Sequence, residues 1–189
     1  MIEIKGSAVG DAIKSVRSRS GDQVYATIVS QLKGDARTLF DPSTRILPSE
    51  WYPLDSFVQF LEADIKITAN GNEEELVKRS EVVVEKQLSG IYRLFVRMGS
   101  PSFLLNRISI IQEAYFRGID VEVKMTSPSE ASMKYTGFTK QHRLMGFTLI
   151  GFYRKAMELS GAKDVRTAFL TSIEEGKGYC ELLLTWSGK

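Results

Sequence analysis

The hydrophobic period of this chain changes near Gly118, and this change constrains the fold more than any other feature of the sequence. Up to Gly118, apolar residues recur at the three- and four-residue spacing of helices that bury one face. Beyond it, most segments alternate between apolar and polar residues, as half-buried strands do. The length suits one domain, so we expect a single domain over 1–189, with a mainly helical part, 1–118, and a strand-rich part, 119–189.

Four strands and one helix are predicted in the second part. The strands are expected near 119–126, 130–137, 164–173 and 178–186, with the turns SPSE and EEGKG joining each pair as a hairpin. A helix is expected over 141–160, because its apolar residues follow helical spacing and Gly161 can end it. The predicted fold is therefore α+β: a helical N-terminal half followed by a four-stranded antiparallel sheet (β-β-α-β-β) covered by helices.

The first part is predicted to contain several helices. They are expected at 11–18, 22–32, 54–65, from 72 onward with a possible break at Gly90, and at 102–117. Pro53 suits the first turn of the helix at 54–65, because it has no backbone N–H to leave unpaired. Trp51 and Tyr52 precede that helix and are interpreted as a plug that packs back onto its first turns, with a pocket-lining role as the alternative.

Composition and the rarer residue types limit the possible chemistry. A net charge of +2, spread over mixed acidic and basic residues, does not suggest a nucleic-acid partner. The single cysteine, Cys180, excludes an intramolecular disulfide and favours a cytoplasmic location, and no apolar run is long enough to insert in a membrane. Cys180 falls on the apolar face of its strand, and the single histidine, His142, is expected to be solvated at a helix start. We therefore expect no catalytic residue, no metal site and no enzyme activity.

Several short motifs resemble a known group of proteins. They are KGSAV, ILPSEWYPLDSF, LSGIYRLFVRMGSPSFLL, GFYRKAMELSGAKDV and GKGYCELLLTW; each is short, and the resemblance extends over nearly the whole chain. They resemble a paralogous family of myxobacteria and related delta-proteobacteria. That family is similar to the ligand-binding superfamily of nitric-oxide signalling and Golgi transport, which includes 4-vinyl reductase-like sensor domains, haem nitric-oxide-binding domains and TRAPP subunits.

The resemblance implies a non-catalytic sensor-type module that binds a small hydrophobic ligand in a cavity between helices and sheet. The alternative is an interaction or dimerisation scaffold without a ligand, with a homodimer or another protein as partner. Phenol-sensing relatives hold zinc with several cysteines, and this chain has only Cys180. Haem-binding relatives use a proximal histidine and a Tyr-x-Ser-x-Arg motif, and this chain has only His142 and lacks that motif. No cofactor is therefore expected.

Aromatic residues are the candidate ligand-binding residues, because such side chains commonly wall apolar pockets. The candidates are Trp51, Tyr52, Tyr92, Phe95, Phe147, Tyr153 and Trp186.

Overall fold

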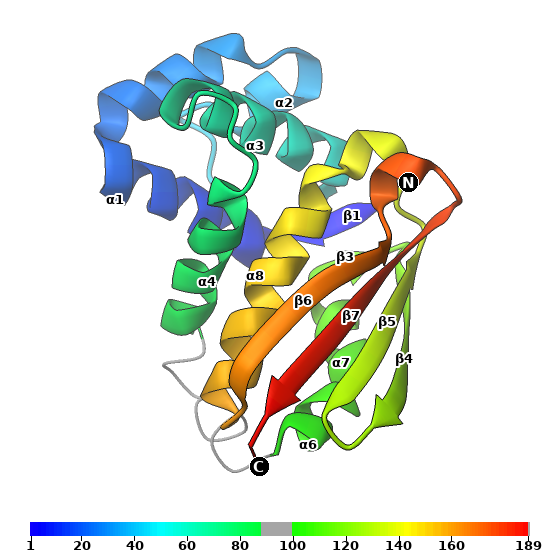
Figure 1. Cartoon of the computed structure of the whole chain (residues 1–189). Helices are drawn as coiled ribbons and strands as arrows, with labels where there is room; N and C mark the ends of the chain where they lie inside the picture. Colours follow the sequence, from blue (N-terminus) through cyan, green and yellow to red (C-terminus); the bar gives the residue numbers. More distant parts are fainter. Residues whose placement is uncertain (88–99, 189) are drawn as a thin grey trace.

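The computed structural model describes residues 1–87 and 100–188 and has the predicted α+β fold (Figure 1). The elements of the helical half are β1 (Glu3–Lys5), α1 (Gly6–Gln31), α2 (Gly34–Leu39), β2 (Trp51–Pro53), α3 (Leu54–Thr68), α4 (Glu75–Gln87), α6 (Pro101–Leu105), α7 (Ile108–Tyr115) and β3 (Phe116–Arg117). The elements of the second half are β4 (Asp120–Ser127), β5 (Glu130–Thr136), η1 (Lys140–His142), α8 (Leu144–Leu159), β6 (Lys163–Thr171), η2 (Ile173–Glu175) and β7 (Tyr179–Ser187). No helix among the described residues is both long enough and apolar enough to cross a membrane.

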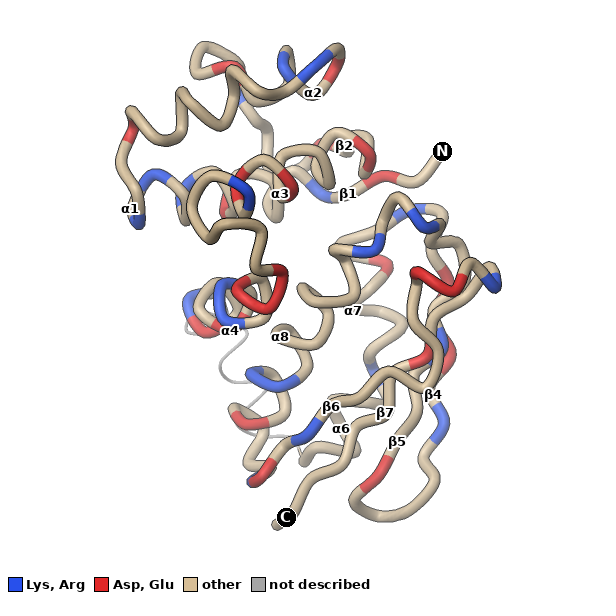
Figure 2. Tube along the Cα trace, turned by 45° about the horizontal axis from the view of Figure 1, so that its top comes forward, with Lys and Arg blue, Asp and Glu red and all other residues tan. Residues whose placement is uncertain are grey.

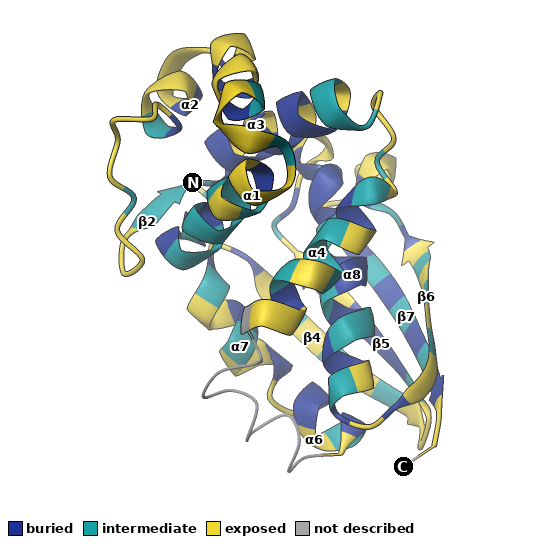
Figure 3. Ribbon diagram, turned by 90° about the vertical axis from the view of Figure 1, so that its left-hand side faces the viewer, coloured by how far each residue is buried: buried dark blue, intermediate teal, exposed yellow. Residues whose placement is uncertain are grey.

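The four predicted strands form one antiparallel sheet in the order β4-β5-β7-β6. Strand β7 lies between β5 and β6, so that Leu182 pairs with Met133 on one side and Phe169 on the other. Alternate residues of β5 and β7 face the core and are fully buried, which confirms the predicted inward faces. Helix α8 packs on this face next to β6, and α7 lies against β4. Figure 3 shows α8 between α4 and the strands.

Trp51 and Tyr52 are not a helix-entry plug, as the sequence had suggested, but lie in a strand. Strand β2 pairs with β1, and β1 also pairs with β3, in a small second sheet. The Trp51 ring lies half-buried between two cations, with Lys5 Nζ 4.3 Å and Arg117 Cζ 4.2 Å from its centroid. The prediction was wrong because this segment pairs with β1 at the distant N-terminus, and this pairing competes with local packing onto the helix. Pro53 lies just before α3 and is not part of its first turn.

The two helices predicted at 11–18 and 22–32 are confirmed as the two parts of α1, which are separated by a kink at Gly21 with φ of 83°, and the first part starts earlier than predicted, at Gly6. One helix prediction needs correction. The single helix predicted at 102–117 is instead α6, α7 and the short strand β3. Its expected start is correct, because the Ser100 hydroxyl accepts a hydrogen bond from the Phe103 N–H at 3.2 Å. The possible break at Gly90 lies outside the described residues.

The two halves meet where α4 crosses α8, and a glycine permits this close approach. A Cβ atom on Gly151 of α8 would lie only 2.2 Å from the Val77 carbonyl oxygen of α4. Beside it, the Ser80 hydroxyl donates to the Thr148 carbonyl oxygen at 2.7 Å, which ties the two helices together. Any larger residue at this position must therefore push the helices apart.

Gly151→Ala should destabilise the protein by about 1–3 kcal/mol, because the added methyl group overpacks the crossing of α4 and α8. The matched control is Gly10→Ala in α1, where an added Cβ atom meets nothing within 4 Å. That change should be neutral or stabilising by up to about 1 kcal/mol, because alanine is the better helix former. Urea unfolding measures both changes, and equal effects of the two would contradict the close crossing.

Candidate functional site

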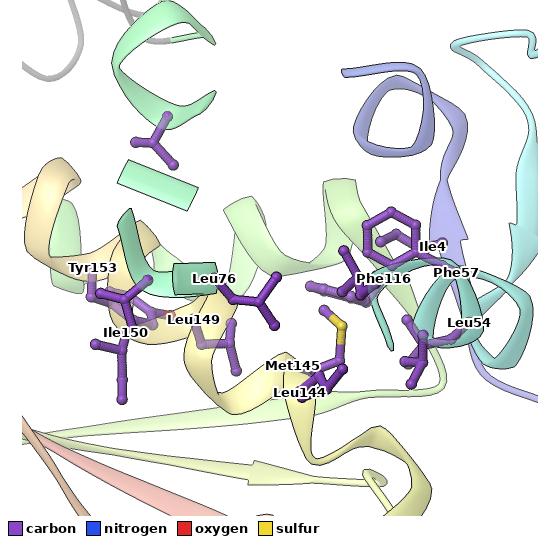
Figure 4. Packing of buried hydrophobic residues seen from close by; sticks show 14 of the residues in the cluster. Ile4, Leu54, Phe57, Leu76, Phe116, Leu144, Met145, Leu149, Ile150 and Tyr153 are labelled. Carbon is purple, nitrogen blue, oxygen red and sulfur yellow. The ribbon is translucent and has the colours of Figure 1, made fainter. Parts of the chain in front are cut away.

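A cavity of about 150 Å³ lies between the helices of the N-terminal half and α8. Most of its wall is apolar and comes from α1, α3, α4, α7 and α8, with single residues from β1 and β3. Figure 4 shows part of this wall, where Leu76 of α4 lies near Leu149 of α8, and Phe57 of α3 lies near Ile4 of β1. The shape and the apolar wall suit a small ligand with an apolar body.

The sequence predicted a cavity between the helices and the four-stranded sheet. The observed cavity does not lie there. None of its lining residues belongs to β4, β5, β6 or β7. Helix α8 explains this arrangement, because it contributes Met145, Thr148, Leu149 and Phe152 to the cavity while its other side packs on the sheet. The space is therefore an interhelical cavity, to whose wall β1 and β3 add one residue each.

The aromatic residues proposed as ligand-binding from the sequence lie apart from one another. Trp51 and Tyr52 are in β2, where the Tyr52 hydroxyl accepts from the Leu47 N–H at 3.0 Å. The other three described candidates, Phe147 and Tyr153 in α8 and Trp186 in β7, pack in or against the core. Tyr92 and Phe95 lie outside the described residues. None of the five described candidates lines the cavity, so their contact with a ligand stays a prediction.

An ionic cluster in the cavity wall joins three helices. Asp64 of α3 is almost fully buried, and its carboxylate accepts from Arg19 of α1 at 2.8 Å and from Arg79 of α4 at 2.7 Å. All three side chains line the cavity. Thr68 completes the cluster, since its hydroxyl donates to Asp64 Oδ1 at 2.9 Å and accepts from Arg79 Nη2 at 2.9 Å. Burial lowers the pKa of Arg79, and the Asp64 carboxylate beside it acts in the opposite direction.

A second polar group reaches the cavity from α7. Gln112 is buried, and its Nε2 donates to the Tyr153 hydroxyl at 3.1 Å, which in turn is hydrogen-bonded to the Tyr135 hydroxyl. Burial raises the pKa of both tyrosines, so they stay neutral and hydrogen-bonded at physiological pH. Among the five described aromatic candidates, Tyr153 is therefore the one that is hydrogen-bonded to a residue of the cavity wall, Gln112.

His142 and Cys180 both lie in the core. His142 is buried, contrary to the solvated position expected from the sequence. Its Nδ1 accepts from the Thr139 N–H at 3.0 Å, so the proton is on Nε2, which donates to the Asp55 carboxylate at 2.8 Å. Cys180 is buried in β7, where desolvation raises the pKa of its thiol to about 12. Neither side chain lines the cavity.

No protein-family model matches this chain, and no curated protein matches it in sequence. Solved structures of H-NOX proteins do match its fold. The Fe(II)–NO form of an H-NOX protein from S. oneidensis has a TM-score of 0.75 at 11% identity and covers 98% of this chain and 100% of that one. The unliganded Fe(II) H-NOX protein from K. algicida has a TM-score of 0.74 at 13% identity, with 98% of each chain covered.

A third match is an oxygen-binding H-NOX domain related to soluble guanylate cyclases, in its oxygen complex. It has a TM-score of 0.70 at 14% identity and covers 98% of this chain and 96% of that one. At identities this low the likeness establishes an H-NOX-like fold. What this chain binds has to be argued from its own residues.

Haem is the group that this fold implies, and the residues of the cavity do not fit it. Haem iron is most often held by histidine or by a cysteine thiolate, and the described residues of the cavity wall include neither; Met145 and Tyr115 of this wall belong to the less common ligand types. Both ring nitrogens of His142 are already hydrogen-bonded elsewhere, and the Cys180 thiol resists ionisation. The volume of about 150 Å³ is also below the roughly 300–1,000 Å³ of pockets that hold drug-sized ligands, most of which are smaller than a porphyrin.

Asp64→Ala should destabilise the protein by about 3–5 kcal/mol, because two guanidinium groups then face each other with no carboxylate between them. The control is Asp22→Ala, which removes an exposed carboxylate that pairs with Arg17 at 2.9 Å. Exposed ion pairs contribute little, so this change should cost less than about 1 kcal/mol. Chemical denaturation of both variants gives the comparison, and a small effect at Asp64 would refute its role in joining the helices.

Proposed function

We propose that this chain is a non-catalytic ligand-binding module of the sensor type, which binds a small, mainly apolar molecule in the interhelical cavity. The observation that carries the proposal is the cavity itself, because folded proteins rarely leave space of this size between well-packed helices without a use for it. The wall is apolar with polar groups at few, defined positions, which is the usual composition of ligand sites.

The position of the cavity suits a sensor. Its wall draws on five helices from both halves of the chain, including α4 and α8 at their close crossing. A ligand there can stabilise one arrangement of these helices over another by contacting all of them at once. The H-NOX-like fold agrees with this proposal, although the proposed ligand is not haem.

The second candidate, an interaction scaffold or homodimer without a ligand, predicts a contiguous apolar surface. Among the described residues the large exposed apolar side chains include Val82 on α4, Ile110 on α7 and Leu170 on β6, which belong to different elements. Scattered exposed residues of this kind are common on monomeric proteins. The ligand-binding proposal is therefore the stronger, and a dimer that forms around it stays compatible with it.

Filling the cavity should abolish binding of a neutral apolar probe. Ala12 of α1 lines the cavity, and Ala12→Phe places an aromatic ring in it. We expect 1-octanol to raise the melting temperature of the parent protein, because a ligand that binds only the folded state stabilises it. The shift should disappear in Ala12→Phe, as measured by differential scanning calorimetry over a range of octanol concentrations.

The matched control is Ala26→Phe, the same substitution at an exposed position of the same helix. It should keep the full octanol response. An equal response in all three proteins would place octanol binding elsewhere, and no response in the parent protein would contradict the proposed function.

A further inference from the structure

The four-stranded sheet ends in a strand that has a neighbouring strand on one side only. Among the described residues, β4 pairs with β5 alone, and it lies at the margin of the molecule in Figure 1. A free edge of this kind presents backbone N–H and C=O groups that can pair with a strand of another chain. The register of β4 shifts only between Met125 and Ser127. The stretch 120–125 therefore contains no bulge that would turn this edge away from a partner.

The charged residues of β4 belong to a row that crosses the outer face of the sheet. Glu181 of β7 pairs with Lys134 of β5, and Lys134 pairs in turn with Glu122 of β4. Opposite charges at directly paired positions stabilise the pairing of strands. The row alternates in sign and ends at the free edge with the carboxylate of Glu122. A strand that paired with β4 would continue this row if it placed a cation opposite Glu122.

A second copy of β4 has a cation at the required position. When two copies pair antiparallel about Val123, Glu122 of each copy lies opposite Lys124 of the other. Both of these side chains are exposed. The same register places Val121 opposite Met125 on the inner face, where both side chains are only half-buried in the single chain. The pairing therefore adds two ion pairs on one face and apolar contacts on the other.

Other registers of the same pairing are disfavoured. A shift by two residues places either Glu122 or Lys124 opposite its own copy, and like charges directly opposite each other are destabilising. A shift by one residue turns the apolar side chains of one copy to the charged face of the other. The charges of β4 thus select the register centred on Val123.

We propose that β4 is a homodimer interface, at which two copies of the chain join their four-stranded sheets edge to edge about a twofold axis at Val123. This interface is independent of the cavity, because no lining residue of the cavity belongs to β4. The contact involves one edge strand of each copy and belongs to the small, transient interfaces that bury less than about 1,200 Å². The dimer is therefore in exchange with the monomer.

Sedimentation velocity on the full chain, from about 10 µM to about 1 mM, should show a reversible monomer–dimer equilibrium, because an interface of this size is weak. Lys124→Glu should weaken the dimer at least about tenfold, because Glu122 of each copy then faces a carboxylate. Glu122→Lys should weaken it likewise. An equimolar mixture of the two variants should associate again, since every lysine then faces a glutamate.

The control is Arg166→Glu, the same reversal of charge at an exposed position of the other edge strand, β6. It should dimerise as the parent protein does. Melting curves show whether each variant is folded, and Lys124→Glu decides alone if Glu122→Lys is not, because its neighbour on β5 is the uncharged Ser132. A parent protein that stays monomeric at the highest concentration, a Lys124→Glu variant that dimerises unchanged, or a mixture of folded variants that does not associate would each overturn the proposal.

Discussion

The cavity depends on the buried carboxylate of Asp64, which holds α1, α3 and α4 together through two guanidinium groups. These three helices form most of the wall opposite α8. A buried charge is costly unless it is paired and hydrogen-bonded, and Thr68 supplies further bonds. The cluster therefore fixes the positions of the helices around an open space. It also places two guanidinium groups and one carboxylate in the cavity wall.

The other constraint is the close crossing of α4 and α8 at Gly151, which brings the helical half against the half that carries the sheet. Acidic and basic residues are mixed along most of the described chain (Figure 2). The cluster of Arg19, Asp64 and Arg79 lies in a partly buried site, where charges are screened less than at the surface. Among residues 1–87 and 100–188, no group of three or more His, Cys, Asp or Glu side chains could hold a metal ion.

The sequence predicted the second half of the fold well, but none of the five described candidate residues lines the cavity. The strands and α8 follow local periodicity, so the inward positions of β5 and β7 were readable directly. Trp51 was placed wrongly because its strand pairs with β1, some 46 residues away, and no local pattern encodes that pairing. Arg19 and Arg79 could not be recognised, because their meeting point depends on how three helices pack. One signal was present: Asp64 interrupts the apolar stripe of α3 between Leu61 and Ile65.

Methyl-resolved NMR during a titration with 1-octanol tests the central claim, a cavity among the helices that takes an apolar ligand, most directly. Leu76 and Leu149 line the cavity, whereas Leu182 and Leu184 of β7 lie in the sheet and serve as internal controls. We predict saturable shifts and intermolecular nuclear Overhauser effects at the first two residues and not at the other two. Contacts confined to surface methyl groups, or a response spread evenly over all four residues, would contradict the account.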